Sequence, residues 1–352
     1  MSWKAVRTVA VLELRQRVRS TRWKIMLVLW GIVLALLCGG LTMLVVAEQS
    51  RDFPAPMLYD ITLGFVLLIG LIVAPTLSAT SINGDRADAT LALLQATALR
   101  PGEIVVGKLL AAWAAALAFL GVALPFLVVL TAAGGSRWIA LLAHLIVLAI
   151  ALGTICAVGL GFSATASRPS ASSVLTYLVM AALVIGTPIA TAISSTAVRG
   201  VQTTLVYETD YDRSTDSALV CKAEPRTYTH EVVHSDRIWW MLALNPFAAL
   251  GDVSARFPLG SSKRDSEKLF GPWGATIDEM RDPVPSTVEV RHCENRDRWG
   301  DDVQYGHDPL SHMAFWPASL ALLMALGALP LWSATRRLRT PTRRLARGTR
   351  VA

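Results

Sequence analysis

The sequence predicts an all-α polytopic membrane protein with six transmembrane helices and a mixed, partly β extracytoplasmic domain between helices five and six. Of its 352 residues, 53% are hydrophobic and 17% are charged. A soluble domain lacks the interior volume to hide so large a share of apolar surface. The apolar residues also gather into uncharged runs of roughly 20 residues, the length that crosses a hydrocarbon core about 30 Å thick.

Six such runs contain no Asp, Glu, Lys or Arg, and His144 is the only histidine within them. The predicted transmembrane segments are 25–47, 61–82, 109–131, 138–164, 172–195 and 313–334. A proton relay and a hydrogen bond at the level of the lipid headgroups both account for His144, and the second is the simpler account. The chain is therefore expected to divide into an interfacial helix 1–24, five transmembrane helices within 25–197, an extracytoplasmic domain 198–311, a sixth transmembrane helix 312–334 and a basic tail 335–352.

Residues 1–24 are expected to form a helix on the cytoplasmic surface of the membrane, because apolar residues recur there near helical spacing between basic ones. These apolar positions are Trp3, Val6, Val9, Ala10, Leu14 and Val18. A flexible basic tail held by anionic lipid is the alternative, and the apolar periodicity favours the helix. Membrane lipid is an expected partner in both cases. The apolar run that begins at Ile25 is too long for a cleaved signal peptide, so we expect a retained first span.

The distribution of Lys and Arg predicts the orientation. Basic residues cluster before the first span and after the last one, so both termini are expected in the cytoplasm. In the segment 198–311, Asp and Glu exceed Lys and Arg by about six, which suits the outer face. The net charge of +7 is thus explained by topology, and no nucleic-acid partner is expected.

The segment 198–311 is long enough for a small domain. Alternating runs at 227–233 and 287–290 predict short strands within it. A further apolar stretch within 238–255 is short and is interrupted by Asn245-Pro246. If that stretch crossed the bilayer, the Arg-rich tail would lie outside, so a re-entrant or interfacial segment is predicted.

Cys221 and Cys293 are the only cysteines outside the predicted spans, and we expect them to form a disulfide. A metal site that combines them with His230, His234 and His292 is the alternative. The spacing of these residues matches no familiar zinc pattern, so no metal is expected.

Motifs for catalysis are missing from the sequence. Residues 102–108 fit the Gly, four residues, Gly-Lys order of a phosphate-binding loop, but Leu109 stands where a Ser or Thr would hold Mg²⁺. Neither a His-Glu-x-x-His pair nor a Gly-x-Ser-x-Gly elbow occurs, and the spans contain no paired carboxylates. We therefore expect that the chain is not an enzyme and binds no cofactor itself.

The most informative stretch is the cytoplasmic segment 83–108, which separates the second and third spans. It has an acidic-basic pair, a Thr-Leu, a Leu pair, a Thr and Leu at a turn, an acid and a Gly-Lys. In order, these are Asp85-Arg86, Thr90-Leu91, Leu93-Leu94, Thr97, Leu99, Glu103 and Gly107-Lys108. Asp85 is expected to cap a short helix, and Pro101 is expected to begin the next one, with Glu103 near its positive end.

This order resembles the signature stretch of type-2 ABC transporter permeases, although Ala89 and Ala98 stand where that family usually has Gly and Pro. The resemblance implies the membrane subunit of an ABC exporter in a bacterial cytoplasmic membrane. It also implies a dimer with a second permease copy or a paralogue, and a separate ABC ATPase subunit that binds ATP and Mg²⁺. By the same resemblance, the residues that couple to the ATPase are Asp85, Arg86, Thr90, Leu91, Leu94, Thr97, Leu99 and Glu103.

Two other functions remain open from the sequence. A non-transporting scaffold or sensor, driven mechanically by an associated ATPase, would have the same spans and the same coupling segment. A proton-coupled secondary transporter is less consistent with the sequence. Such a protein needs charged residues within its spans, and the predicted spans of this chain have almost none.

Overall fold

The computed structural model describes residues 2–47, 55–88, 99–133, 137–214, 220–257, 269–291 and 312–339. The chain divides into two compact units, which we describe separately. The first, the helical unit, comprises Met1–Gly186, Ala243–Gly274 and Ala314–Ala352. The second, the strand unit, comprises Thr187–Leu242 and Ala275–Met313.

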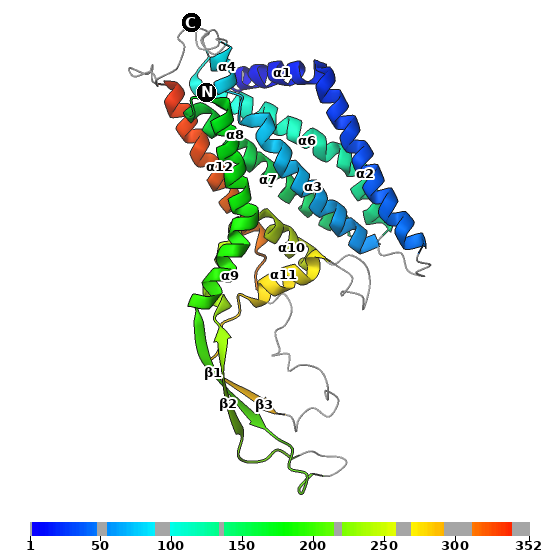
Figure 1. Cartoon of the computed structure of the whole chain (residues 1–352), viewed down its shortest axis with the longest axis vertical. Coiled ribbons are helices and arrows are strands. Elements are labelled where there is room, and N and C mark those ends of the chain that lie inside the picture. Colours follow the sequence, from blue (N-terminus) through cyan, green and yellow to red (C-terminus); the bar gives the residue numbers. More distant parts are fainter. Residues whose placement is uncertain are drawn as a thin grey trace. The chain divides into compact units, whose positions relative to one another are not determined.

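The helical unit is built from long helices joined by short connections (Figure 1). Its helices are α1 (Trp3–Arg19), α2 (Thr21–Ala47), α3 (Ala55–Ser78), α4 (Asn83–Ala87), α6 (Pro101–Ala133), α7 (Trp138–Thr165), α8 (Pro169–Ala181), α10 (Pro246–Arg256) and α12 (Trp316–Arg339). A π-helical turn η1 (Ala182–Gly186) follows α8, a 3-10 segment η3 (Trp239–Leu244) precedes α10, and α11 (Phe270–Glu279) begins in this unit.

Six helices among the described residues are long and apolar enough to cross a membrane, in agreement with the six predicted spans. They are Thr21–Met43, Ala55–Ala87, Pro101–Ala133, Trp138–Thr165, Pro169–Ala197 and Trp316–Leu338. The prediction began the second span at residue 61, whereas the helix begins at Ala55 and includes Asp60. The helix tolerates this acid because the Asp60 carboxylate accepts hydrogen bonds from the backbone N–H groups of Leu269 and Phe270.

Helix α7 is the centre of the helical unit and packs against α3, α6 and α12. Small residues on α7 allow the close approach of α12: a Cβ at Gly161 would lie 2.9 Å from the Pro330 Cα, and Ala157 contacts Gly327. Gly153 faces Trp113 of α6, whose indole N–H donates to the Ala149 carbonyl at 2.8 Å. This face of small residues on α7 is thus used for helix packing.

The strand unit contains a three-stranded sheet in the order β2-β1-β3. Strand β1 (Arg199–Tyr207) runs antiparallel to β2 (Arg226–Val233) and parallel to β3 (Thr287–Arg291). Strands β2 and β3 confirm the two predicted strands, while β1 had not been predicted. Helix α9 (Thr187–Ala197), the 3-10 turn η2 (Ser235–Arg237) and the end of α11 complete the unit.

The segment predicted to be re-entrant or interfacial, 238–255, forms η3 and most of α10. Asn245 caps α10, because its side chain accepts the Phe247 N–H at 2.9 Å, and its amide donates to the Val184 carbonyl at 3.2 Å. Helices α10 and α11 cross at two glycines, since a Cβ at Gly274 would lie 2.4 Å from the Gly251 carbonyl carbon. From Ala243 to Gly274 the chain belongs to the helical unit, so the predicted domain 198–311 is divided between the two units.

Candidate functional site

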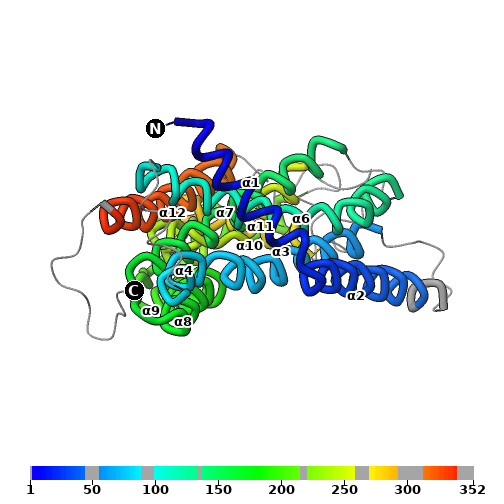
Figure 2. The backbone as a smooth tube through the Cα atoms, turned by 90° about the horizontal axis from the view of Figure 1, so that it is seen from above, coloured from blue at the N-terminus to red at the C-terminus, as the bar shows by residue number. Residues whose placement is uncertain are grey.

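Helix α1 lies on α6 at the end of the helical unit where α4 is found. Figure 2 shows α1 crossing above the ends of α6 and α3. Val6 and Val9 are the buried residues of α1. The contact depends on Gly107, because a Cβ at this position would lie 2.7 Å from the Val9 Cβ and 3.1 Å from the Val6 carbonyl oxygen. The two backbones therefore approach more closely than any larger residue at 107 allows.

One buried ammonium group joins three helices at this crossing. Lys108 of α6 is 1% exposed, and its Nζ lies 2.5 Å from Glu13 Oε1 of α1 and 2.7 Å from Asp85 Oδ2 of α4. Both carboxylates are themselves largely shielded from solvent, with side-chain exposures of 21% and 25%. A shielded charge is stable only when it is paired, so these contacts fix α1 and α4 to α6.

Glu103 completes the start of α6. Its carboxylate accepts the Arg100 N–H at 2.9 Å, which is the bond that an acid at the third helical position makes back to the N-cap residue. The other carboxylate oxygen accepts the Ser2 N–H at 2.5 Å. The same side chain therefore caps α6 and holds the residue before α1, and the helix does begin at Pro101 as predicted.

Arg17, near the other end of α1, points inward. Its Nη2 donates to the Leu77 carbonyl at 2.7 Å, where α3 ends and its last carbonyls lack helical partners. Burial lowers the pKa of the Arg17 guanidinium, and the nearby Glu13 carboxylate partly offsets this effect. An arginine stays charged at neutral pH even so, because the guanidinium group is a very strong base. Helix α1 is thus attached to α3 as well as to α6.

A buried network of hydroxyl and amide groups fixes the base of α4. The Ser163 hydroxyl of α7 accepts the N–H groups of Ile82 and Asn83 at 2.9 and 3.1 Å. The Asn83 amide donates to the Ser172 hydroxyl of α8 at 2.8 Å, and Ser172 in turn donates to the Ala79 carbonyl at 2.5 Å. The short helix is therefore held by α6, α7 and α8.

The predicted cap of this short helix is wrong. Helix α4 begins at Asn83, so Asp85 lies inside it and Asp88 ends it. The reason is that Ser163 already supplies the oxygen that a capping side chain would offer to the first N–H groups. The Asp85 carboxylate is consequently available to pair with Lys108.

The structure brings some of the predicted coupling residues together and leaves others undescribed. Asp85 and Glu103 belong to the polar contacts around α1, α4 and α6, Arg86 is half-buried in α4, and Leu99 is half-buried just before α6. Thr90, Leu91, Leu94 and Thr97 lie outside the described residues. We name the set Glu13, Asp85, Glu103 and Lys108 the charged node.

Two of the four members of the charged node, Glu13 and Lys108, were not among the predicted coupling residues. Glu13 is the only acid within residues 3–19, which is a detectable signal in so basic a helix. Lys108 lies directly before an apolar run, and it was predicted as the end of the family-like order without a partner of its own. Residues 102–109 lie within α6, so they form helical turns where a phosphate-binding motif needs a loop.

A second polar region joins α10, α11 and α12 to the long helices. His144 is buried and lies 3.0 Å from both the Tyr59 hydroxyl of α3 and the Ser254 hydroxyl of α10. It is thus bonded inside the protein, where a headgroup-level contact had been expected. Asp252 accepts the N–H groups of Phe315 and Trp316 at 2.8 and 2.9 Å and so caps α12.

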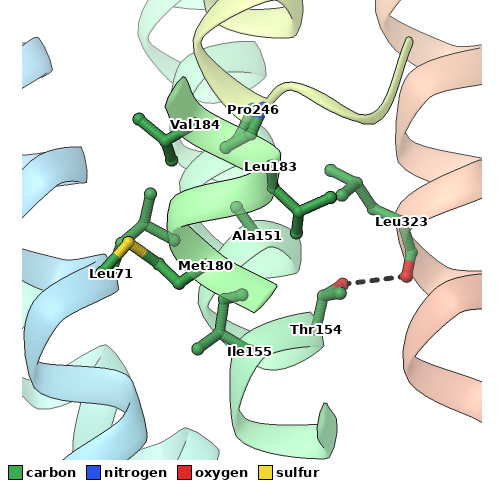
Figure 3. Close-up of a pocket in the computed structure, with 9 residues that line it drawn as sticks. All are labelled: Leu71, Ala151, Thr154, Ile155, Met180, Leu183, Val184, Pro246 and Leu323. Carbon is green, nitrogen blue, oxygen red and sulfur yellow. Dashed lines mark hydrogen bonds between the residues drawn. The ribbon is translucent and has the colours of Figure 1, made fainter. Parts of the chain in front are cut away.

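The helical unit also contains a small apolar pocket with a cavity volume of about 10 Å³ (Figure 3). Its lining residues are Leu71, Ala151, Thr154, Ile155, Met180, Leu183, Val184, Pro246 and Leu323. The only side-chain hydroxyl among them, that of Thr154, donates to the Leu323 carbonyl at 3.2 Å. A cavity of this volume has room for about one water molecule, so the pocket does not by itself form a path across the bilayer.

Of the predicted disulfide, one half is described. Cys221 is disulfide-bonded, and Cys38 and Cys156 are free thiols. Cys293 lies outside the described residues, so its pairing with Cys221 stays a prediction.

No family model matches this chain, and no curated protein sequence matches it.

Proposed function

We propose that the chain is the membrane-spanning permease subunit of an ATP-driven exporter in a bacterial cytoplasmic membrane. In this proposal the chain forms the transport path together with a second permease copy or a paralogue. A separate ABC ATPase subunit binds ATP and Mg²⁺, and residues 83–108 couple the two subunits. Both termini and the segment 83–108 then lie in the cytoplasm, and the sheet lies outside.

The observation that carries the proposal is the order of residue types from Asp85 to Lys108, located between two helices that can span a membrane. The way α4 is held supports it further. A segment that receives force from a partner must be attached firmly to the helices that it moves. The ion pairs of Lys108 and the bonds of Ser163 and Ser172 attach α4 in this way.

In this proposal the acidic residues and the leucines of 83–108 have different roles. The carboxylates of Asp85 and Glu103 already have partners inside the chain. In the proposal they therefore hold the coupling segment to the rest of the chain. Contact with the ATPase then falls to the leucines. Each leucine that a partner groove buries fully contributes about 1.5–3 kcal/mol, whereas an exposed ion pair contributes about 1 kcal/mol or less.

The test is co-purification of the chain with its ATPase from the native membrane, followed by a measurement of ATP turnover. We expect Leu91→Asp combined with Leu94→Asp to release the ATPase and to leave membrane insertion intact. The matched control is Val201→Asp combined with Val220→Asp. Both valines are exposed in the strand unit, at 64% and 39%, and this pair should retain the ATPase. If the leucine pair still purifies with the ATPase at the parent rate of turnover, the coupling assignment is wrong.

A non-transporting scaffold or sensor driven by the same ATPase remains the second candidate, because the three-stranded sheet lies outside the candidate spans. The two candidates differ in one outcome. An exporter moves an amphiphile across a reconstituted bilayer when ATP is added. The amphiphile is a fluorescent short-chain phospholipid or another amphiphilic compound that the complex accumulates. A scaffold hydrolyses ATP and changes the protease sensitivity of the strand unit without moving any such compound.

A further inference from the structure

Helix α1 has an inward face and an outward face of different chemistry. The inward face carries the buried Val6 and Val9, together with the bonded side chains of Glu13 and Arg17. The outward face carries four exposed cations, Lys4, Arg7, Arg15 and Arg19. Between them lie exposed apolar side chains, of which Trp3 is 68%, Leu12 is 51% and Val18 is 49% exposed.

Within α1, whose residues are all described, the outward face has no acid to balance its cations. Glu13 is the only acid of α1, and its carboxylate is turned inward onto Lys108. Two acids of the neighbouring helices are also engaged on the inner side, because Asp85 binds Lys108 and Glu103 binds the Ser2 and Arg100 N–H groups. The charged node therefore removes negative charge from the very surface on which the cations are exposed.

The connection to α2 determines the level at which this face lies. A single residue, Ser20, separates α1 from α2, and α2 contains the first helix that can span a membrane. Figure 1 shows that α1 turns away from the direction of α2 at this point. Helix α1 therefore lies at the end of the spanning helices, where a bilayer has its headgroups. Two more exposed cations, Arg22 and Lys24, follow in the first turn of α2.

We propose that the outward face of α1 is a binding surface for anionic phospholipids of the adjacent leaflet. The guanidinium and ammonium groups bind headgroup phosphates, and Trp3, Leu12 and Val18 enter the region between the headgroups and the acyl chains. The occupant is a lipid because cations and apolar side chains alternate on the same face. An anionic lipid offers both a phosphate and a hydrocarbon to such a face at every point along the helix.

The test uses the full-length chain in detergent, titrated with dioleoyl-phosphatidylglycerol or dioleoyl-phosphatidylcholine. Bound lipids are counted by native mass spectrometry, and the lipid-induced shift in Tm is measured. The parent protein should retain phosphatidylglycerol in preference to phosphatidylcholine, and added salt should reduce that preference. Arg7→Gln, Arg15→Gln and Arg19→Gln together should reduce it at least tenfold, since each cation near an anionic surface strengthens binding roughly fivefold.

Two variants serve as controls. Arg17→Gln removes a cation from the same helix, but Arg17 is bonded to the Leu77 carbonyl, so this variant should keep the lipid preference while lowering Tm. Arg137→Gln removes an exposed cation that precedes α7 and should change neither quantity, which keeps the test decisive if Arg17→Gln does not fold. The proposal is overturned if the triple variant keeps the parent preference, or if Arg137→Gln loses it equally. It is also overturned if the triple variant loses a protein partner while its lipid binding is unchanged.

Discussion

Lys108 is the residue on which most of the charged node depends. A fully buried ammonium group is costly in isolation, and here two carboxylates from two different helices compensate it. Both carboxylates are less exposed to solvent than they would be in the unfolded chain. The pairing is therefore asymmetric: removing the lysine leaves two shielded acids side by side, while removing either acid leaves one ion pair intact.

We therefore expect Lys108→Met to destabilise the protein by on the order of 3 kcal/mol, the cost of breaking a buried ion pair from one side. The measurement is the Tm of the purified protein in detergent. Lys24→Met is the control, because Lys24 is exposed, and it should leave Tm unchanged. Adding Glu13→Gln and Asp85→Asn to Lys108→Met should restore part of the loss, because the two acids no longer repel each other. A Tm equal to the parent's for Lys108→Met alone would contradict this account.

The sequence could identify the acids of the coupling segment but not their partners. Asp85 and Glu103 match the family-like order, which by resemblance assigns them to coupling with the ATPase. Their actual partners are far away in the chain: Glu103 binds the Ser2 N–H across 101 positions, and Lys108 binds Glu13 across 95. Only the packing of α1 on α6 brings these groups together, and no periodicity within one segment encodes that packing.

At the scale of helices, the crossing of α1 and α6 depends on the absence of a side chain at one position. Gly107 faces Val9 and the Val6 carbonyl, whereas Gly121 in the same helix has open space where its Cβ would be. The two glycines thus have the same helical backbone but opposite surroundings.

Gly107→Ala should therefore destabilise the protein by about 1–3 kcal/mol through overpacking. Gly121→Ala, the matched control, should be neutral or should stabilise it by about 0.5–1 kcal/mol, because alanine is the better helix former. Thermal unfolding of both variants in the same detergent decides the matter. If both substitutions lower Tm equally, α1 does not pack on α6 in the way described.

Helices were more predictable than strands in this chain. The uncharged runs identified every long helix that can span a membrane among the described residues, because hydropathy is a property of composition and needs no partner. Strand β1 was missed because it begins with Arg199-Gly200 and alternates weakly in polarity. Its place in the sheet comes from pairing with β2 and β3, which the sequence of β1 alone does not reveal.

At the scale of the whole molecule, the orientation in the membrane is the property that most of the proposed function requires. Reporter fusions after Arg350 and near Lys108 are expected to give cytoplasmic signals, because Lys and Arg cluster at both ends of the spanning region. A fusion near Asp216 is expected to give an external signal. An external C-terminus would contradict the six-span topology and would require residues 239–250 to cross the bilayer.

The hydrogen bonds of Asp60 can form only late in the synthesis of the chain. Asp60 lies in the second candidate span, but the N–H groups that bind its carboxylate belong to Leu269 and Phe270, up to 210 positions later. At roughly 5–20 residues per second, a ribosome needs on the order of 10–40 seconds to supply these donors. Throughout that interval the Asp60 carboxylate of the nascent chain has not yet received these two hydrogen bonds. The packing of α11 against Asp60 is therefore a late step of assembly that follows insertion of the first five spans.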